Sequence, residues 1–104
     1  MNGSSELVGR VREALREVID PEIGFNIVDI GLVYDIALEK RGIVKITMTT
    51  TTKGCPATDF LKDGVGEAAH NVEGVHSADI RLTYDPPWTP DMMSSEAKQY
   101  LGGR

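Results

Sequence analysis

The hydrophobic and polar positions along the chain change period several times, and each change predicts a new element. A helical stripe comes first, with apolar side chains at the spacing of one face: Leu7, Val8, Val11, Ala14, Leu15, Val18 and Ile19. We therefore expect a helix that Ser4 or Ser5 caps, that runs to Ile19 and that stops at Pro21. Residues 20–30 show no clean period and predict a loop of about ten residues.

Strict alternation then predicts a strand over residues 32–39, with Leu32, Tyr34, Ile36 and Leu38 on one face. Residues 40–42 supply a short turn. The alternation resumes in a second strand, whose inward face is Val44, Ile46 and Met48. The two strands are expected to form a hairpin, and the second runs into four consecutive threonines at positions 49–52.

A second helical stripe follows, made of Ala57, Phe60, Leu61, Gly64, Val65, Ala68, Ala69 and Val72. Pro56 suits the first helical position, which makes Cys55 the N-cap or its neighbour, and residues 71–74 end the helix. Alternation over residues 78–84 predicts a third strand. Residues 89–91 favour one helical turn, and Ser94 is expected to cap a closing helix through Leu101.

The element order α-β-β-α-β-α predicts an α/β fold of two layers, a three-stranded mixed sheet with its helices mainly on one face. The first two strands are antiparallel, and a helical crossover joins the second to the third. The pattern leaves the central strand open. We expect a single domain over residues 1–104, with residues 1–5 disordered and residues 102–104 forming a tail.

Composition excludes several classes of protein. The chain has 11 Lys and Arg against 16 Asp and Glu, and its net charge of -5 repels a phosphate backbone, so nucleic-acid binding is not expected. No apolar run approaches the roughly 20 residues that cross a bilayer, so we expect no membrane span. The single cysteine cannot form an internal disulfide, and the first ten residues resemble no secretory signal. A reducing, cytoplasmic location is the expectation.

Strand direction brings three segments to one end of the sheet, namely residues 20–30, 49–55 and 86–91. Ligands of open α/β sheets tend to bind beyond the carboxyl ends of the strands, so this end is the candidate site. The candidate residues are Asp20, Glu22, Thr51, Thr52, Cys55 and Trp88. His70 and His76 belong at the opposite end, which argues against a zinc site shared with Cys55.

Cys55 is the first candidate for the chemistry of this site. A thiol at a helix N-terminus, with Lys53 nearby, favours the thiolate that ligates metal or attacks an electrophile. The ordinary alternative is a buried cysteine that acts as a small hydrophobe. Asp20 and Glu22 have two interpretations as well: Asp20 caps local amides in a turn, or the carboxylates complete an iron site or let Glu22 move protons to the thiol.

The remaining candidates are less specific. The threonine run suits a strand because its residues are β-branched, yet the hydroxyls of Thr51 and Thr52 lie near Cys55 and could bond a ligand or the thiolate. Trp88 is more typical of a packing lid than of a specific binder.

Three segments carry a resemblance to a known family: DPEIGFNIVDIGLVYDI (20–36), TTTTKGCP (49–56) and DPPWTPDMMSSEA (85–97). In this order they resemble the metal-sulfur cluster biosynthetic proteins, formerly a domain of unknown function. That family includes iron-sulfur maturation factors and the small phenylacetate-degradation component. The similarity spans residues 6–101, and it implies a small α/β fold and a role in assembling or delivering iron-sulfur clusters.

By position, the resemblance implies that Cys55 is the functional cysteine, together with Asp20, Glu22, Thr51 and Thr52. Lys53 stands where the family pattern has a small residue or proline, which could tune the thiol. The chain also lacks the additional C-terminal cysteines of the phenylacetate-type members, so that assignment loses ground.

One cysteine cannot hold an iron-sulfur cluster tightly, because clusters are usually bound by four ligands. We therefore expect transient binding of a cluster or iron, either between two Cys55 residues of a homodimer with outside thiols or between Cys55 and a client. The expected partners are apo iron-sulfur client proteins or assembly factors. One alternative is a non-enzymatic adaptor in a maturation or phenylacetate-type oxygenase complex. Another is a thiol enzyme with Cys55 as nucleophile and Glu22 as proton handler, although no resolving cysteine is present.

Overall fold

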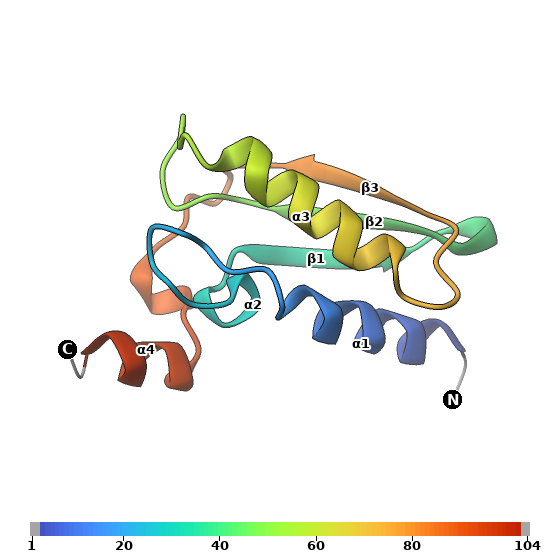
Figure 1. Cartoon of the computed structure of the whole chain (residues 1–104), viewed down its shortest axis with the longest axis horizontal. Coiled ribbons are helices and arrows are strands. Elements are labelled where there is room, and N and C mark those ends of the chain that lie inside the picture. The colour runs from blue at the N-terminus through green and yellow to red at the C-terminus, as the bar shows by residue number, and fades with distance from the viewer. Residues whose placement is uncertain (1–2, 103–104) are drawn as a thin grey trace.

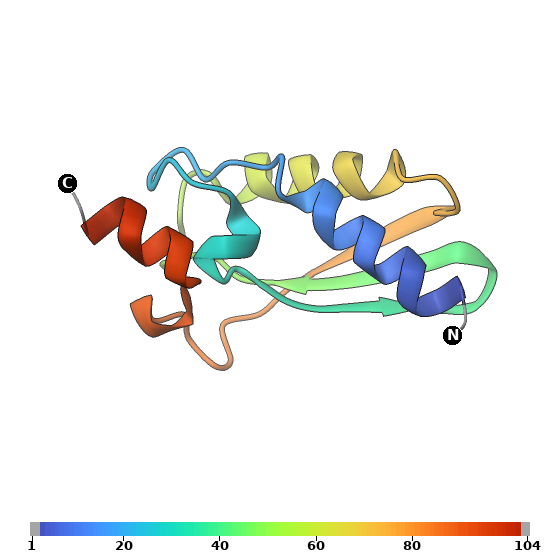
Figure 2. The same ribbon diagram turned by 90° about the horizontal axis from the view of Figure 1, so that it is seen from below.

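Two helices lie side by side on one face of a three-stranded sheet (Figures 1 and 2). The structure is a computed structural model that describes residues 3–102. The helices are α1 (Gly3–Leu15) and α3 (Thr58–His70), and the strands are β1 (Val33–Leu38), β2 (Ile43–Met48) and β3 (Ser77–Leu82). β2 is central, antiparallel to β1 and parallel to β3. The predicted two-layer α/β fold with a mixed sheet is confirmed.

The core lies between the sheet and the two helices. β2 alternates as predicted, with Val44, Ile46 and Met48 buried. Ile46 is paired with Ile36 on β1 and with Ile80 on β3, so one apolar layer crosses all three strands. The helices cover this layer with fully buried residues that include Val11, Leu15, Leu61 and Val65. Each such side chain contributes about 1.5–3 kcal/mol of burial free energy.

The first helix ends earlier than its apolar stripe predicts. α1 stops at Leu15, and the chain continues in tight turns in which the amide of Val18 donates to the carbonyl of Leu15 over 3.1 Å. Val18 is still buried, but Ile19 is 47% exposed and forms a β-bridge with Asn26. The bridge requires extended backbone, which explains why the helix cannot reach Ile19.

Residues 20–30, predicted as a loop, contain the short helix α2 (Ile27–Ile30). The Asn26 side chain caps its start by accepting from the amide of Asp29, and Gly31 ends it in the left-handed conformation with φ 94°. Ile27 and Ile30 are fully buried, so the segment contributes to the core. A helix of four residues is too short to show a periodic pattern in the sequence.

A β-bulge interrupts the alternation predicted for β1. Val33 pairs with Met48 and Asp35 pairs with Thr47, so Tyr34 is the extra residue. Val33 packs against the core, while the hydroxyl of Tyr34 donates to the carbonyl of Pro86 over 2.8 Å. The bulge therefore turns Tyr34 toward the C-terminal segment instead of the core, and its predicted place beside Ile36 is wrong.

The second long helix also begins later than predicted. α3 starts at Thr58 with Ala57 as its N-cap, so Pro56 and Cys55 lie in the turn before the helix. Phe60, expected in the buried stripe, is 64% exposed. Leu61, Val65 and Ala69 provide the buried face instead.

The remaining connections agree with the sequence pattern. A 3-10 turn, η1 (Lys40–Gly42), joins β1 to β2, and another, η2 (Pro90–Met92), precedes α4 (Ser95–Gly102). The hydroxyl of Ser94 accepts from the amide of Ala97, which confirms its predicted capping role. Residues 1, 2, 103 and 104 of the expected tails lie outside the described residues, and α1 begins at Gly3. Within residues 3–102, no helix is long and apolar enough to span a membrane.

Candidate functional site

Three connecting segments meet at one end of the sheet, where β2 and β3 end and β1 begins (Figures 1 and 2). The pairs Val33–Met48 and Met48–Leu82 bring these strand ends together. Beyond them, the amide of Thr49 donates to the carbonyl of Leu32 and the amide of Thr83 to that of Met48. The opposite end holds His76, whose amide donates to Gly42. The predicted convergence is confirmed.

A small pocket of about 230 Å³ opens where the second and third of these segments meet. The structure brings Thr51, Thr52 and Trp88 together in its wall. Thr50, Lys53, Tyr84 and Pro87 complete the wall, which the sequence pattern does not predict. That pattern places Tyr84 on the inward face of the third strand, but β3 ends at Leu82 and frees the tyrosine side chain for the pocket.

Hydrogen bonds fix the pocket wall. The buried Thr50 hydroxyl donates to the carbonyl of Thr52 over 2.7 Å and lies 2.8 Å from the Tyr84 hydroxyl. Because the threonine has only one proton to donate, Tyr84 acts as donor to Thr50 in this pair. The ammonium of Lys53 lies 5.9 Å from the centre of the Tyr84 ring, within cation–π range. The wall thus offers hydroxyls and one cation, which suits a small polar or anionic group.

Trp88 links the pocket to α2. Its indole Nε1 donates to the carbonyl of Ile30 over 2.9 Å, and its ring packs against the core. The prediction of Trp88 as a packing residue therefore agrees with the contacts.

Cys55 is buried, with 6% of its surface exposed, and lies in the turn between β2 and α3. Thr58 holds this turn, because both its amide (3.0 Å) and its hydroxyl (2.7 Å) donate to the carbonyl of Cys55. The predicted N-cap position of Cys55 is wrong, since Ala57 occupies it. The thiol therefore lies in the turn that leads into the helix.

Asp20 is 1% exposed, and its Oδ1 accepts from the amides of Glu22 (2.8 Å) and Ile23 (3.4 Å). The structure thus favours the interpretation of Asp20 as a turn-capping residue. Glu22 is exposed. Among the described residues, no three or more His, Cys, Asp and Glu side chains gather to hold a metal ion, so Cys55, Asp20 and Glu22 do not form a complete iron site by themselves.

A charged cluster beside the site has no counterpart among the sequence predictions. Asp29 of α2 is buried, and its Oδ2 accepts from Arg16 (2.6 Å) and Asn26 (2.8 Å). The hydrogen bond from Asn26, assisted by further bonds and by the charge of Arg16, lowers the pKa of Asp29 below its ordinary value despite burial. The carbonyl of Asp29 also accepts from the amide of Ser94, so the cluster joins α2 to the residue after α1 and the residue before α4. The Asn-x-x-Asp spacing is the N-capping signal that could have revealed it.

These features define a small α/β protein with one buried thiol, two residues along the chain from Lys53 of the pocket wall. The comparisons with known proteins show the family to which it belongs. The family model described as "Iron-sulfur cluster assembly protein" matches residues 9–80. The chain belongs to this family.

Several relatives have descriptions that agree with this family. The chain is 43% identical over 89 residues to the Fe-S protein maturation auxiliary factor YitW of Bacillus subtilis, covering 86% of this chain and 87% of the relative. It is 39% identical over 85 residues to the Fe-S protein maturation auxiliary factor SufT of Staphylococcus aureus, and the match covers 82% of this chain and 97% of the relative. A crystal structure from Bacillus anthracis, described as a domain of unknown function, superposes with a TM-score of 0.93 at 35% identity and covers 98% and 97%.

Proposed function

We propose that this protein is an iron-sulfur assembly or delivery factor in which Cys55 is a transient ligand of a cluster or of iron that passes through as cargo. The supporting observation is the place of the chain's only cysteine, in the turn after β2 at the end of the sheet where the three segments meet. The descriptions of the family and of its curated relatives support the same field of activity.

The chemistry of one thiolate favours transfer over storage. Clusters are usually held by four thiolates, or by thiolates with histidine replacements, so one chain supplies too few. Two Cys55 residues of a homodimer with outside thiols, or Cys55 with a client's cysteines, would complete the set. Because Cys55 is only 6% exposed, the turn that holds it has to open toward the partner. A reducing cytoplasm, the location we propose, keeps such a thiol free.

The other candidate residues have supporting roles in this proposal. Asp20 shapes the turn that carries the exposed Glu22, which we propose as the group that exchanges a proton with the thiol. Thr51, Thr52 and Trp88 line the pocket that would accept a polar group of the client or of the cargo. Apo iron-sulfur proteins and assembly factors are the proposed partners.

Anaerobic reconstitution with iron and sulfide, followed by absorption spectroscopy, tests Cys55 directly. Wild type is expected to develop cluster absorption, and Cys55→Ser is expected to lose it, with circular dichroism confirming that the variant folds. Equal absorption in both proteins would exclude Cys55 as a ligand. Sedimentation of the reconstituted wild type then distinguishes a cluster shared by two chains from one held by a single chain.

A non-enzymatic adaptor is the second candidate. The chain is 36% identical over 88 residues to an Escherichia coli protein described as a putative component of 1,2-phenylacetyl-CoA epoxidase, and it spans 52% of that relative's length. An adaptor would bind its partner without cargo. Absence of cluster absorption in wild type, combined with equal capture of a purified apo iron-sulfur protein by wild type and Cys55→Ser, would favour this function.

A further inference from the structure

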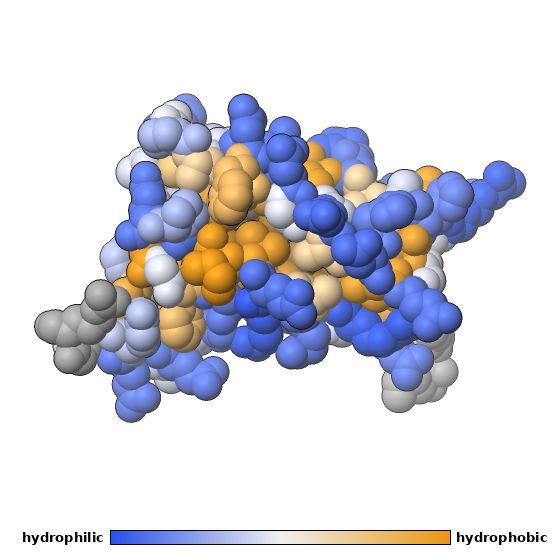
Figure 3. Space-filling view, in the orientation of Figure 1, coloured by the Kyte–Doolittle hydropathy of each residue, from blue (hydrophilic) through white to orange (hydrophobic). Residues whose placement is uncertain are grey.

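A groove of about 540 Å³ lies between the segment that follows α1 and the outer side of α3. Two large apolar side chains line it, Ile19 from the segment and Phe60 from the first turn of α3. Figure 3 shows apolar surface between α3 and this segment, with hydrophilic residues around it. None of the residues that line the pocket at Thr51, Thr52 and Trp88 belongs to this groove.

Ile19 and Phe60 remain accessible to solvent, although both belong to apolar stripes that the sequence predicts to be buried. Phe60 is 64% exposed and Ile19 is 47% exposed. Ile19 is held outside the helical path by its bridge with Asn26, and Phe60 lies outside the buried face of α3. Contiguous apolar surface bordered by polar residues is typical of protein interaction sites.

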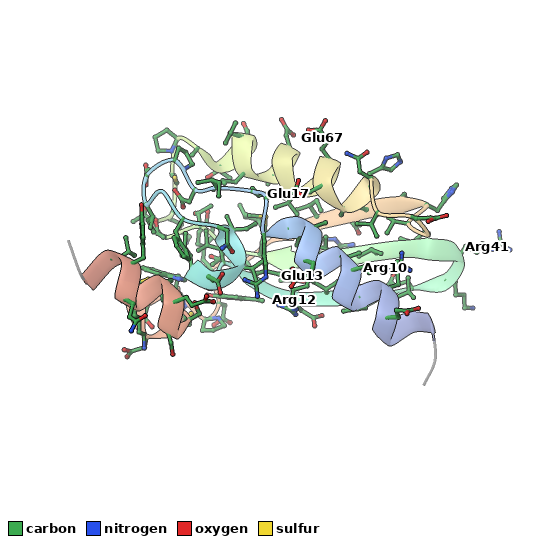
Figure 4. The ribbon with its side chains drawn as sticks, turned by 60° about the horizontal axis from the view of Figure 1, so that its bottom comes forward. Arg10, Arg12, Glu13, Glu17, Arg41 and Glu67 are labelled. Carbon is green, nitrogen blue, oxygen red and sulfur yellow. The ribbon has the colours of Figure 1, made fainter. Side chains whose placement is uncertain are left out.

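The charge around the groove has one sign. Its acidic side chains are Glu17, Asp63 and Glu67, and no lysine, arginine or histidine lines it. Glu67 belongs to α3 and Glu17 follows α1, whereas Arg10 and Arg12 lie further toward the N-terminus of α1 (Figure 4). Among the side chains that the structure describes, no ion pair neutralises any of these three carboxylates.

Two arginines near this region are already engaged. Arg16 pairs with Glu13 and Asp29, and the guanidinium of Arg10 donates to the carbonyl of Glu73. The groove is therefore an apolar surface inside an acidic rim, and its charge favours a cationic partner.

We propose that this groove binds an amphipathic, basic helix of a partner protein. Apolar side chains of that helix would cover Phe60 and Ile19, while lysine or arginine side chains on its flanks would pair with Glu17, Asp63 and Glu67. A second copy packed groove to groove is a poor occupant, because it would set the same acidic side chains Glu17, Asp63 and Glu67 against each other. The inference does not depend on the proposed function, since it rests on the shape and charge of the groove alone.

A pair of labelled synthetic peptides tests the proposal by fluorescence anisotropy. Both are helices of about four turns with leucine along one face; the first has lysine at its polar positions and the second has glutamate. We expect the full-length protein to bind the lysine peptide, to bind the glutamate peptide at least about tenfold more weakly, and to lose affinity as salt rises. Absence of binding to the lysine peptide, or equal binding of both, would overturn the proposal.

Three variants locate the binding. Phe60→Ala is expected to lower the affinity for the lysine peptide about tenfold, which is the effect of losing an interface anchor. Circular dichroism checks that α3 remains folded in this variant. The double variant Asp63→Lys with Glu67→Lys is expected to lower the affinity for the lysine peptide at least as much. The control, Asp35→Lys with Glu96→Lys, changes the net charge equally at exposed positions outside the groove and should leave affinity within about twofold.

Equal losses in the charge variant and its control would mean non-specific attraction and would reject the groove. Unchanged affinity of Phe60→Ala would do the same. Sedimentation of the protein alone gives the remaining outcome: a wild-type dimer that Phe60→Ala dissociates would replace the proposed partner by a second copy of the chain.

Discussion

The indole of Trp88 and the carbonyl of Ile30 are joined by a hydrogen bond of 2.9 Å, although 58 residues separate them in the sequence. Ile30 ends α2, and Trp88 belongs to the segment between β3 and α4. The bond therefore closes two of the three segments of the candidate site against each other.

Trp88→Phe tests this bond. The variant keeps an aromatic ring against the core but loses the donor, so we expect the free energy of unfolding to fall by about 1 kcal/mol. Chemical denaturation followed by circular dichroism measures the change. Trp88→Ala also removes the packing of the ring, so its free energy of unfolding should fall clearly further. Equal stability of wild type and Trp88→Phe would show that the bond contributes nothing.

Gly31 allows the same region to pack closely. Its φ of 94° is left-handed, and a Cβ at this position would lie 2.5 Å from the carbonyl oxygen of Met92. We expect Gly31→Ala to reduce the free energy of unfolding by about 3 kcal/mol, because backbone strain adds to the steric overlap with the main chain. Denaturation curves measure the loss.

Gly54 supplies the matched control, since its φ is 74° but no atom other than those of its chain neighbours lies within 4 Å of the position of a Cβ. Gly54→Ala should lower the free energy of unfolding by about 1 kcal/mol, because it adds only the strain of a left-handed alanine. If the two alanine variants lost equal stability, the contact with Met92 would have no role.

The regular parts of the fold follow from the sequence pattern, and the departures have local physical causes. The alternation of β2 and the convergence of three segments at the end of the sheet could be predicted, because side-chain period and strand direction determine them. Side-chain hydrogen bonds and single backbone conformations leave no such period. Asn26 and Gly31 terminate a helix of one turn, and the bulge at Tyr34 shifts one residue without changing the composition of β1.

The candidate site was predictable to the same extent. Strand direction located the segments that hold Thr51, Thr52, Cys55 and Trp88, but it could not determine which side chains share a pocket. The start of α3 at Thr58 puts Cys55 in the turn before the helix. The hydrogen bond between Thr50 and Tyr84 builds a wall from residues that the pattern assigned to strands.

The pKa of Asp29 makes one part of the stability depend on pH. Because hydrogen bonds from Asn26 and Arg16 keep the pKa in the folded protein below the ordinary value of 3.8, the contribution is present above that value and is lost as the pH falls through the folded pKa. We expect Asp29→Asn to lose about 2 kcal/mol of the free energy of unfolding at neutral pH, in the range of charged hydrogen bonds. The difference from wild type should shrink in acid below pH 3.8.

The exposed pair of Asp79 with Arg81 provides a control for this prediction. Asp79→Asn should change stability by less than about 1 kcal/mol, because solvent screens exposed ion pairs. Denaturation at several pH values measures both variants. A loss for Asp29→Asn that stayed constant into strong acid would rule out the carboxylate charge as its cause.

The hydroxyl of Thr58 holds the turn that contains Cys55, because it donates over 2.7 Å to the carbonyl of this buried residue, and we expect the bond to limit access to the thiol. Thr58→Val keeps the shape of the side chain and removes the donor, which weakens the closed turn by about 1 kcal/mol. We expect the reaction of Cys55 with a thiol reagent to become about fivefold faster, since labelling follows the population of the open form when reclosing is rapid. Thr89→Val, at an exposed threonine whose side chain caps no helix, should leave the rate unchanged. If Thr58→Val reacted at the wild-type rate while its global stability fell, the turn would not be the gate, and access to the thiol would have to come from motion of another segment.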